Sequence, residues 1–351
     1  MENNQIHNDK IQLVKYLIEG ALKLIDQPRE REIITRRFVL EGAKETLEQI
    51  GERLDITRER VRQLEKAALI RLKIAAEKGN IENLADIEKA LIRNLAESGR
   101  ISKTKTLAEK YFENSAENQE VSYILFLSEI SSKLVIVQEN DKYHSAIANA
   151  EYGDERKIKT AIDEIVNIIK KQKSPMTLDE LDAKLSYEHP SQIEAIASIS
   201  KLLASLNGIW GLEKWPSVNP KNIRDKIFVV LGAKKEPMHF SEIAEEIRKS
   251  DFSRKDVTTQ AIHNELIKDK RFVLIGRGIY ALDDWGFKKG TVADTIAAVL
   301  KEAGEPLYRD EIVKRVLEKR KVKETTVLLN LQSKKEFVRV AKATYTLAEQ
   351  E

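Results

Sequence analysis

Apolar positions along the chain recur mostly every three to four residues, which is the spacing of a helix with one buried face. From Lys10 to Leu24 this spacing predicts a first helix. From Thr46 to Lys73 it predicts two helices joined by a tight turn at residues 54–56. We expect the first of these two helices to begin at a capping box, in which Thr46 and Gln49 each bond the other's backbone.

The second helix of this pair, which Thr57 can cap, divides into two faces at about 100° per residue. The apolar face carries Val61, Leu64, Ala68 and Leu72. The opposite face carries Glu59, Arg62, Gln63 and Lys66, with Arg58 at its edge. Arg can bond a guanine edge, Gln an adenine edge, and Glu can accept from cytosine, each worth about 1–3 kcal/mol of discrimination. Because a recognition helix uses its N-terminal turns, Arg58, Glu59 and Gln63 are the candidate base contacts.

Beyond residue 80 a longer pattern recurs, with a helix, a Pro turn, two further helices and a two-stranded hairpin. The Pro turns lie at Pro175, Pro237 and Pro306, and the hairpins end at 208–212, 278–282 and 343–347. A period of roughly 60–70 residues suits one small domain, and three helices with a hairpin predict a winged helix. A weaker copy is expected at 81–150, with Leu134–Val137 and Lys142–His144 as its hairpin.

The predicted fold class is therefore mainly α, with an N-terminal helix-turn-helix followed by tandem winged-helix domains that carry small β-hairpin wings. The predicted domains are 1–80 (helix-turn-helix), 81–152 (a degenerate winged-helix-like unit), and 156–219, 220–290 and 291–351 (winged-helix units).

Composition narrows the class of protein. The 351 residues are 42 % hydrophobic, enough for several small cores. The formal net charge is +3 with 33 % charged residues, so any affinity for nucleic acid must come from local patches such as Arg53 to Lys73. The absence of Cys excludes disulfides and Cys-based metal sites. The sequence shows no signal peptide and no apolar run free of charge, so we expect a cytoplasmic protein without a membrane span.

The sequence offers little for catalysis. The five His, at positions 7, 144, 189, 239 and 263, have no paired metal-ligand spacing. No Gly-rich loop ends in Gly-Lys-Ser/Thr to hold a phosphate, and no nucleophile elbow occurs. We therefore expect no enzyme, no cofactor and no metal.

The segments PREREII (28–34), Arg37-Phe38, TLEQIGERL (46–54) and ITRERVRQLEKAAL (56–69) resemble region four of housekeeping-type bacterial sigma factors. That resemblance implies promoter DNA of the minus-35 type and the flap region of the RNA polymerase beta subunit as partners, with a nucleoid-associated location. Taken together with the exposed face and the cap of the second helix, the candidate DNA-binding residues are Thr46, Leu47, Thr57, Arg58, Glu59, Arg60, Arg62, Gln63 and Lys66. By the family's pattern Arg58, Glu59 and Gln63 contact bases, Arg60 and Arg62 lie near phosphate or a neighbouring activator, and Thr46 and Leu47 lie at phosphate. Only 27 residues precede Pro28, too few for a strand-melting sigma domain, so we expect no promoter opening by this chain alone.

The unit at 221–286 resembles the HARE-type winged-helix family, which is best known in the delta subunit of RNA polymerase. The residues that carry this resemblance are PMHFSEI (237–243), GIYALDDWG (278–286) and WGLEKWP (210–216) in the preceding unit. The family implies attachment to DNA or polymerase without naming a reaction.

Two further groups of side chains could touch DNA. The third helix of the 220–290 unit carries Gln260, His263, Asn264 and Lys268, with Arg277 at the hairpin tip, and the last unit carries Lys319, Arg320, Lys321, Lys323, Lys334 and Lys335. These side chains suit phosphate or minor-groove contact, and for the first group a merely solvated helix face is an equally open interpretation.

The sequence favours a sequence-specific DNA-binding bacterial transcription factor that reads a promoter element and associates with RNA polymerase. Two alternatives stay open. One is a polymerase accessory subunit of the delta type, which acts through protein interactions. The other is a DNA-sensing adaptor of a restriction or defence system.

Overall fold

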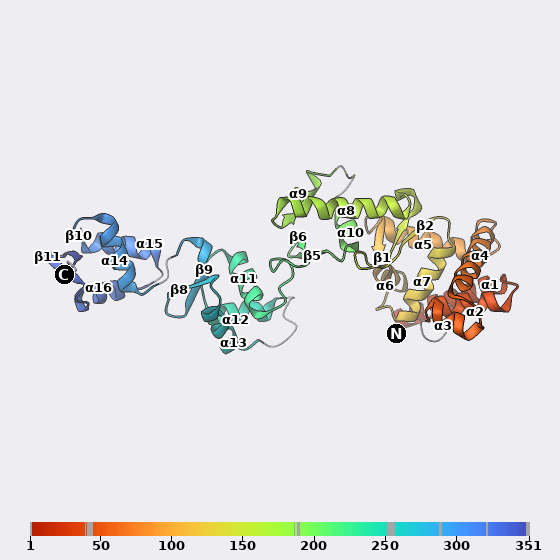
Figure 1. Ribbon diagram of the computed structural model, residues 1–351, viewed down its shortest axis with the longest axis horizontal. Coiled ribbons are helices and arrows are strands. Elements are labelled where there is room, and N and C mark those ends of the chain that lie inside the picture. Colours follow the sequence, from red (N-terminus) through yellow and green to blue (C-terminus); the bar gives the residue numbers. More distant parts are fainter. Residues whose placement is uncertain are drawn as a thin grey trace. The chain divides into compact units, whose positions relative to one another are not determined.

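The computed structural model describes residues 2–38, 40, 45–185, 187, 190–250, 257–287, 290–320 and 322–348 (Figure 1). Helices make up 60 % of the chain, and the strands form small antiparallel sheets, so the fold is mainly α. The chain divides into two compact units between Lys214 and Trp215.

The described residues of the N-terminal segment form helices and no strand. These are α1 (Glu2–Lys23), α2 (Pro28–Arg37), α3 (Leu47–Leu54) and α4 (Arg58–Glu77). The predicted helix at residues 10–24 is confirmed as part of α1, and α4 ends where Lys78 and Gly79 interrupt the helical pattern.

Four later segments repeat one order of elements: helix, short strand, two helices, two strands. The first two repeats contain α5 (Leu84–Ala96), β1 (Ile101–Lys103), α6 (Thr104–Phe112), α7 (Asn118–Ile130), β2 (Leu134–Val137), β3 (Ala146–Asn149), and then α8 (Glu155–Gln172), β4 (Met176–Thr177), α9 (Leu178–Asp182), α10 (Pro190–Ile199), β5 (Leu203–Leu206), β6 (Ile209–Leu212). The last two contain α11 (Ile223–Lys234), β7 (Met238–His239), α12 (Phe240–Lys249), α13 (Thr259–Lys268), β8 (Phe272–Gly276), β9 (Ile279–Leu282), and then α14 (Val292–Ala303), β10 (Leu307–Tyr308), α15 (Arg309–Lys319), α16 (Glu324–Ser333), β11 (Phe337–Ala341), β12 (Thr344–Leu347). In each repeat the last strand lies between the other two.

One predicted strand was wrong. The sequence placed the second hairpin strand of the first repeat at Lys142–His144, whereas β2 pairs with β3 at Ala146–Asn149. Tyr143 instead forms an isolated bridge to Ser200 of the second repeat, and its hydroxyl donates to Asp163 at 2.8 Å. The aromatic residue that suggested a strand is thus used in packing between repeats.

A single hydrophobic core spans the predicted domain boundary at residue 80. It includes Val14 and Leu17 of α1, Leu72 of α4, and Phe112 and Phe126 of the first repeat, each at most 2 % exposed. Helix α7 packs against both α4 and α1 (Figure 1). The N-terminal helices and the first repeat therefore fold as one body, which fixes the direction of α4.

The second repeat covers the sheet of the first. Helix α8 packs against β2, and α10 packs against β1. The backbone of His144 donates to the carbonyl of Ile199 at 2.8 Å, and that of Lys201 donates to the carbonyl of Lys142 at 2.7 Å. Helices of the second repeat thus pack against the sheet of the first.

Candidate nucleic-acid interface

Helix α3 begins at the predicted capping box. The Gln49 backbone N–H donates to Thr46 Oγ1 at 3.2 Å, and the Thr46 backbone N–H donates to Gln49 Oε1 at 2.8 Å. Two of the donors that a helix start leaves unpaired are thereby satisfied. The Leu47 and Glu48 amides at this start point out of the helix, and these are the groups that can bond a phosphate.

The turn between α3 and α4 depends on a close approach at Gly51. The backbone N–H of Ile56 donates to the Gly51 carbonyl at 3.0 Å, and Asp55 adopts the left-handed conformation at φ 55°. A Cβ on Gly51 would lie 2.7 Å from the carbonyl oxygen of Ile56. A side chain at this position would push the turn outward, so the glycine sets the angle at which α4 leaves α3.

Helix α4 begins at Thr57, whose hydroxyl accepts from the Arg60 backbone N–H at 3.2 Å. Its first turns rest on a small core of Ile33, Ile50 and Val61, all fully buried. The predicted apolar face is confirmed at Val61, Ala68 and Leu72, and Leu64 is half-buried. Burial of that face leaves the other face of α4 exposed.

Eight of the candidate residues are exposed on the helix-turn-helix. These exposed residues are Thr46, Thr57, Arg58, Glu59, Arg60, Arg62, Gln63 and Lys66. Leu47 differs, because its side chain is half-buried and packs against the Ile33, Ile50 and Val61 core. Any phosphate contact at Leu47 therefore involves its backbone amide.

Four of these side chains are paired along the helix. Arg62 donates to both oxygens of Glu59, at 2.9 Å and 2.6 Å. Hydrogen bonding by Arg62 lowers the pKa of Glu59, and the same contact raises the pKa of Arg62. Arg60 donates to Gln63 Oε1 at 3.3 Å. DNA readout by Glu59 or Gln63 must exchange these bonds for bonds to bases.

A hollow beside the turn is strongly acidic. It is lined by Glu48, Gly51, Glu52, Asp55, Ile56, Thr57, Arg58 and Glu59. Its lining includes four carboxylates and a single guanidinium, that of Arg58. Such a hollow disfavours a phosphate and suits hydrogen-bond donors, such as the exocyclic amino groups of adenine and cytosine.

Several other cations of the predicted basic patch hold the fold together. Arg71 pairs with Glu30, which is 4 % exposed, and Lys73 lies 3.5 Å from Glu129 of α7. Arg53 bonds Glu45 at 3.3 Å. Nothing in the local pattern identified these pairs, because their partners lie far away in the sequence or in the linker before Thr46. The patch available to DNA is thus narrower than residues 53–73.

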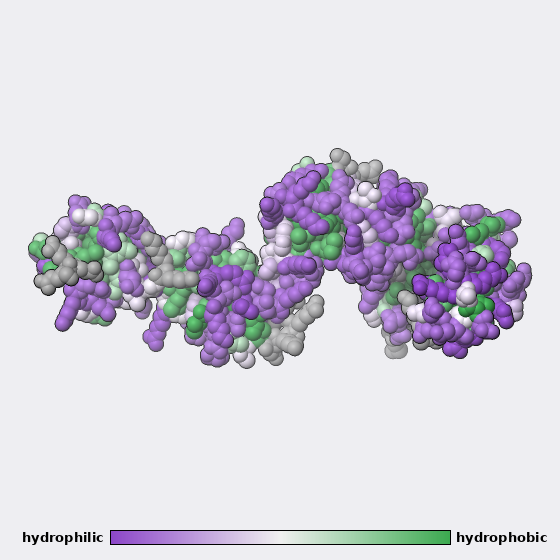
Figure 2. All heavy atoms as spheres, in the orientation of Figure 1, coloured by the Kyte–Doolittle hydropathy of each residue, from purple (hydrophilic) through white to green (hydrophobic). Residues whose placement is uncertain are grey.

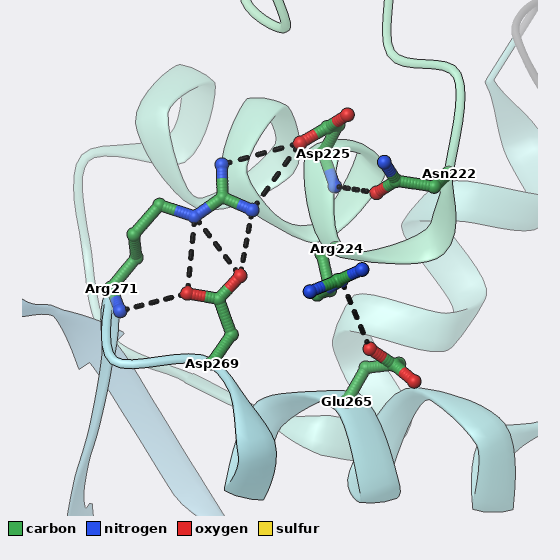
Figure 3. A network of polar contacts seen from close by, with 6 residues as sticks. All are labelled: Asn222, Arg224, Asp225, Glu265, Asp269 and Arg271. Atoms are coloured by element: carbon green, nitrogen blue, oxygen red, sulfur yellow. Dashed lines mark hydrogen bonds and ion pairs between the residues drawn. The ribbon is translucent and has the colours of Figure 1, made fainter.

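Charged side chains of the 220–290 repeat also form ion pairs within the fold. Figure 3 shows Arg271 donating to Asp269 and to Asp225, while Arg224 pairs with Glu265 at 3.2 Å. This network joins α11, α13 and the start of β8. It holds α13 against the repeat, and both arginines are paired with carboxylates of their own repeat.

The candidate contacts on α13 differ in their surroundings. Gln260 and Asn264 are exposed and bond each other at 3.1 Å, and Arg277 is exposed at the hairpin tip. Lys268 is exposed at the end of the helix. The ring of His263 lies 4.7 Å from that of Phe240 and 6.1 Å from that of Tyr280, so this side chain packs against aromatic rings.

The predicted basic surface of the last repeat needs a correction. Arg320 is 5 % exposed and donates to backbone carbonyls, and Lys319 pairs with Glu302 at 2.5 Å. Lys323, Lys334 and Lys335 are exposed, whereas Lys321 lies outside the described residues. Arg320 is therefore unavailable to phosphate.

Over the described ranges, no group of three or more His, Cys, Asp or Glu is arranged to hold a metal ion. Within those same ranges, no helix has the length and apolar character needed to cross a membrane.

Comparison with known families identifies the segment that contains this interface. No curated protein matches the chain. Residues 27–73 match the family Sigma-70, region 4, which is a DNA-binding helix-turn-helix found in transcription factors. The matched range contains α2, α3 and α4 up to Lys73, and with them all eight exposed candidate residues. The part of the chain from residue 27 to residue 73 is therefore a region of the Sigma-70 region 4 type.

Proposed function

We propose that this protein is a sequence-specific transcription factor that reads a promoter element of the minus-35 type through the N-terminal half of α4. One observation carries this proposal: Arg58, Glu59 and Gln63 lie exposed on the first turns of a capped helix whose other face is locked in a core. A helix held in this way can enter the major groove without rearranging.

Each side chain has a chemical role in this proposal. Arg58 bonds a guanine edge, Gln63 an adenine edge, and Glu59 accepts from a cytosine amino group. The cations Arg60, Arg62 and Lys66, which follow on the helix, neutralise phosphates, and the amides at the start of α3 bond a phosphate beside Thr46.

The four repeats are winged-helix modules in this proposal, and the HARE-like one and its neighbours add weak contacts to DNA or to RNA polymerase. Their shared order of three helices and a three-stranded sheet supports the assignment. Several weak modules in one chain raise affinity through effective concentration, without a single tight site.

Association with RNA polymerase, through the flap region of its beta subunit, completes the proposal. Exposed apolar side chains near the helix-turn-helix could serve a protein partner: Tyr16 is 59 % exposed, Ile70 48 % and Ile74 46 %. We assign the protein no catalytic role and place it in the cytoplasm on the nucleoid. A delta-like accessory subunit and a DNA-sensing adaptor in defence are the alternative functions, and polymerase recruitment distinguishes them.

The first test is fluorescence anisotropy on a duplex with a minus-35-like hexamer and on a scrambled duplex, with salt varied. Salt is varied because phosphate binding alone would imitate recognition. We expect the hexamer to bind at least roughly tenfold more tightly, or about 1.4 kcal/mol. Gln63→Ala should lose that margin, whereas Lys89→Ala on α5, a control for loss of an exposed side chain, should keep it. Equal binding to both duplexes would refute base readout.

Polymerase recruitment separates the alternatives. If the Arg58→Ala, Gln63→Ala double variant loses sequence preference but still co-purifies with polymerase, both activities exist and are separate. Recruitment without any sequence preference in the wild-type protein would favour the accessory subunit. Failure to co-purify with polymerase would favour the defence adaptor.

A further inference from the structure

The β8–β9 hairpin of the 220–290 repeat has buried apolar side chains on both faces. Phe272 and Tyr280 face the core of their own repeat. Val273 and Ile275 face the other way, with Ala281, and are 1 % and 0 % exposed. In the sheet order β7-β9-β8, β8 is an edge strand, so its outer backbone groups need a partner or water.

The following repeat supplies that partner through Arg320. Its Nε donates to the carbonyl of Ile275 at 3.2 Å, and Nη2 donates to that of Leu274 at 3.4 Å. The same guanidinium also bonds the Thr291 carbonyl at 3.0 Å. The side chain thus occupies the outer edge of β8 at its bulge and ties this edge to the start of α14.

Val273 and Ile275 pack against Ile279, Trp285 and Phe287 of their own repeat, whereas the matching strand of the last repeat exposes the corresponding side chains. Strands β8 and β11 pair with their neighbours in the same register, and both have a bulge one residue before their end. Val338 therefore corresponds to Val273, and Val340 corresponds to Ile275. Their exposed fractions are 42 % and 51 %, against 1 % and 0 %.

The rim of this open strand is basic. Lys334, Lys335, Arg339 and Lys342 are exposed within residues 334–342, and Glu336 is the one carboxylate of that segment. Figure 2 shows apolar surface beside polar surface on this C-terminal repeat. This surface combines two exposed valines at alternate positions, the backbone of an edge strand and a cationic rim. Its complement is an extended chain with apolar and acidic side chains.

We propose that β11 is a docking strand for an extended segment of a partner protein that alternates apolar and acidic residues. The segment adds a strand next to β11, so its backbone bonds the edge while its apolar side chains cover Val338 and Val340. Its carboxylates meet Arg339 and Lys342. Because DNA offers phosphates and no apolar side chain for the valine pair, a peptide fits this surface better than a duplex does. This inference concerns a surface apart from α4 and does not depend on promoter reading.

The test uses a fluorescein-labelled peptide of alternating Val and Glu, about eight residues long, and anisotropy with the full-length protein. Two further peptides are controls: one with Lys in place of Glu, and one methylated on alternate backbone nitrogens. We expect the Val/Glu peptide to bind and each control to bind at least roughly tenfold more weakly. Equal binding of the methylated peptide would overturn strand addition.

Variants of the protein locate the site. Val338→Asp should abolish binding of the Val/Glu peptide. Leu274→Asp on β8, whose backbone carbonyl accepts from Arg320, is a control of similar exposure (46 %, against 42 % for Val338) and should leave binding unchanged. Reversing the charge of the rim with Arg339→Glu and Lys342→Glu should make the protein prefer the Val/Lys peptide. Unfolding could not produce this outcome. If Val338→Asp instead weakens duplex DNA binding and spares the peptide, the strand belongs to a DNA surface and the proposal fails.

Discussion

Replacing Gly51 by Ala tests whether the turn of the helix-turn-helix positions α4. In a helix interior this change normally stabilises by about 1 kcal/mol. Here the new Cβ would lie 2.7 Å from the Ile56 carbonyl oxygen, about 0.7 Å short of the 3.4 Å at which ordinary contact begins. Overpacking of this kind costs about 1–3 kcal/mol. Since the obstructing atom belongs to the backbone, we expect the overpacking cost to exceed the gain in helix propensity. Gly51→Ala should therefore destabilise the protein by about 0–2 kcal/mol net.

The matched control is Gly20→Ala on α1, where no atom lies within 4 Å of the new Cβ. The free energy of unfolding of this variant should rise by about 0.5–1 kcal/mol. Urea denaturation of both variants measures the difference, and anisotropy on a hexamer duplex measures DNA affinity. We expect Gly51→Ala to lose DNA affinity and Gly20→Ala to keep it. If both variants were stabilised equally and bound DNA alike, the close approach at Gly51 would have no role in placing α4.

Further predictions concern the cap, the charges and the repeats. Thr57→Ala removes the acceptor for the Arg60 amide and should cost about 1 kcal/mol in urea denaturation; an unchanged midpoint would contradict the capping role. Glu59→Gln removes the carboxylate proposed to accept from a cytosine amino group and should lower discrimination at that base pair by about 1–3 kcal/mol; unchanged discrimination would place Glu59 away from the DNA. Arg320→Lys cannot reproduce the fork to β8 and should cost about 1–3 kcal/mol and speed hydrogen exchange near Ile275; wild-type exchange there would refute the tie. Burial, then Lys103 and Lys201, lowers the pKa of His144, so the unfolded state takes up a proton first and stability should fall as pH drops below about 6.5. In His144→Gln that part of the pH dependence should vanish, and its persistence would assign it to another group.

The start of the helix-turn-helix could be predicted from sequence because its determinants are local. The capping box joins Thr46 to Gln49 and the second cap joins Thr57 to Arg60, so each bond spans three residues. The buried and exposed faces of α4 follow from helical periodicity for the same reason. Local rules of this kind do not depend on the rest of the fold.

Contacts between residues that lie far apart in the sequence could not be predicted from it. Glu30 and Arg71 are 41 positions apart, and no periodicity links them. Arg320 stands in a run of basic residues that suggested a solvated surface, yet it is buried against β8. Its role depends on how one repeat packs on the previous one, which neither charge pattern nor spacing encodes. The misplaced strand at Lys142–His144 has the same origin, because Tyr143 packs against a neighbouring repeat.

The central claim is that the first turns of α4 read base pairs, and binding-site selection from a random duplex library tests it most directly. The wild-type protein should enrich one short motif at physiological salt. Gln63→Ala should lose preference at a single position of that motif and keep it at the others, because one side chain reads one base pair. If the wild-type protein enriches no motif, or Gln63→Ala enriches the same motif unchanged, α4 does not read DNA through this face.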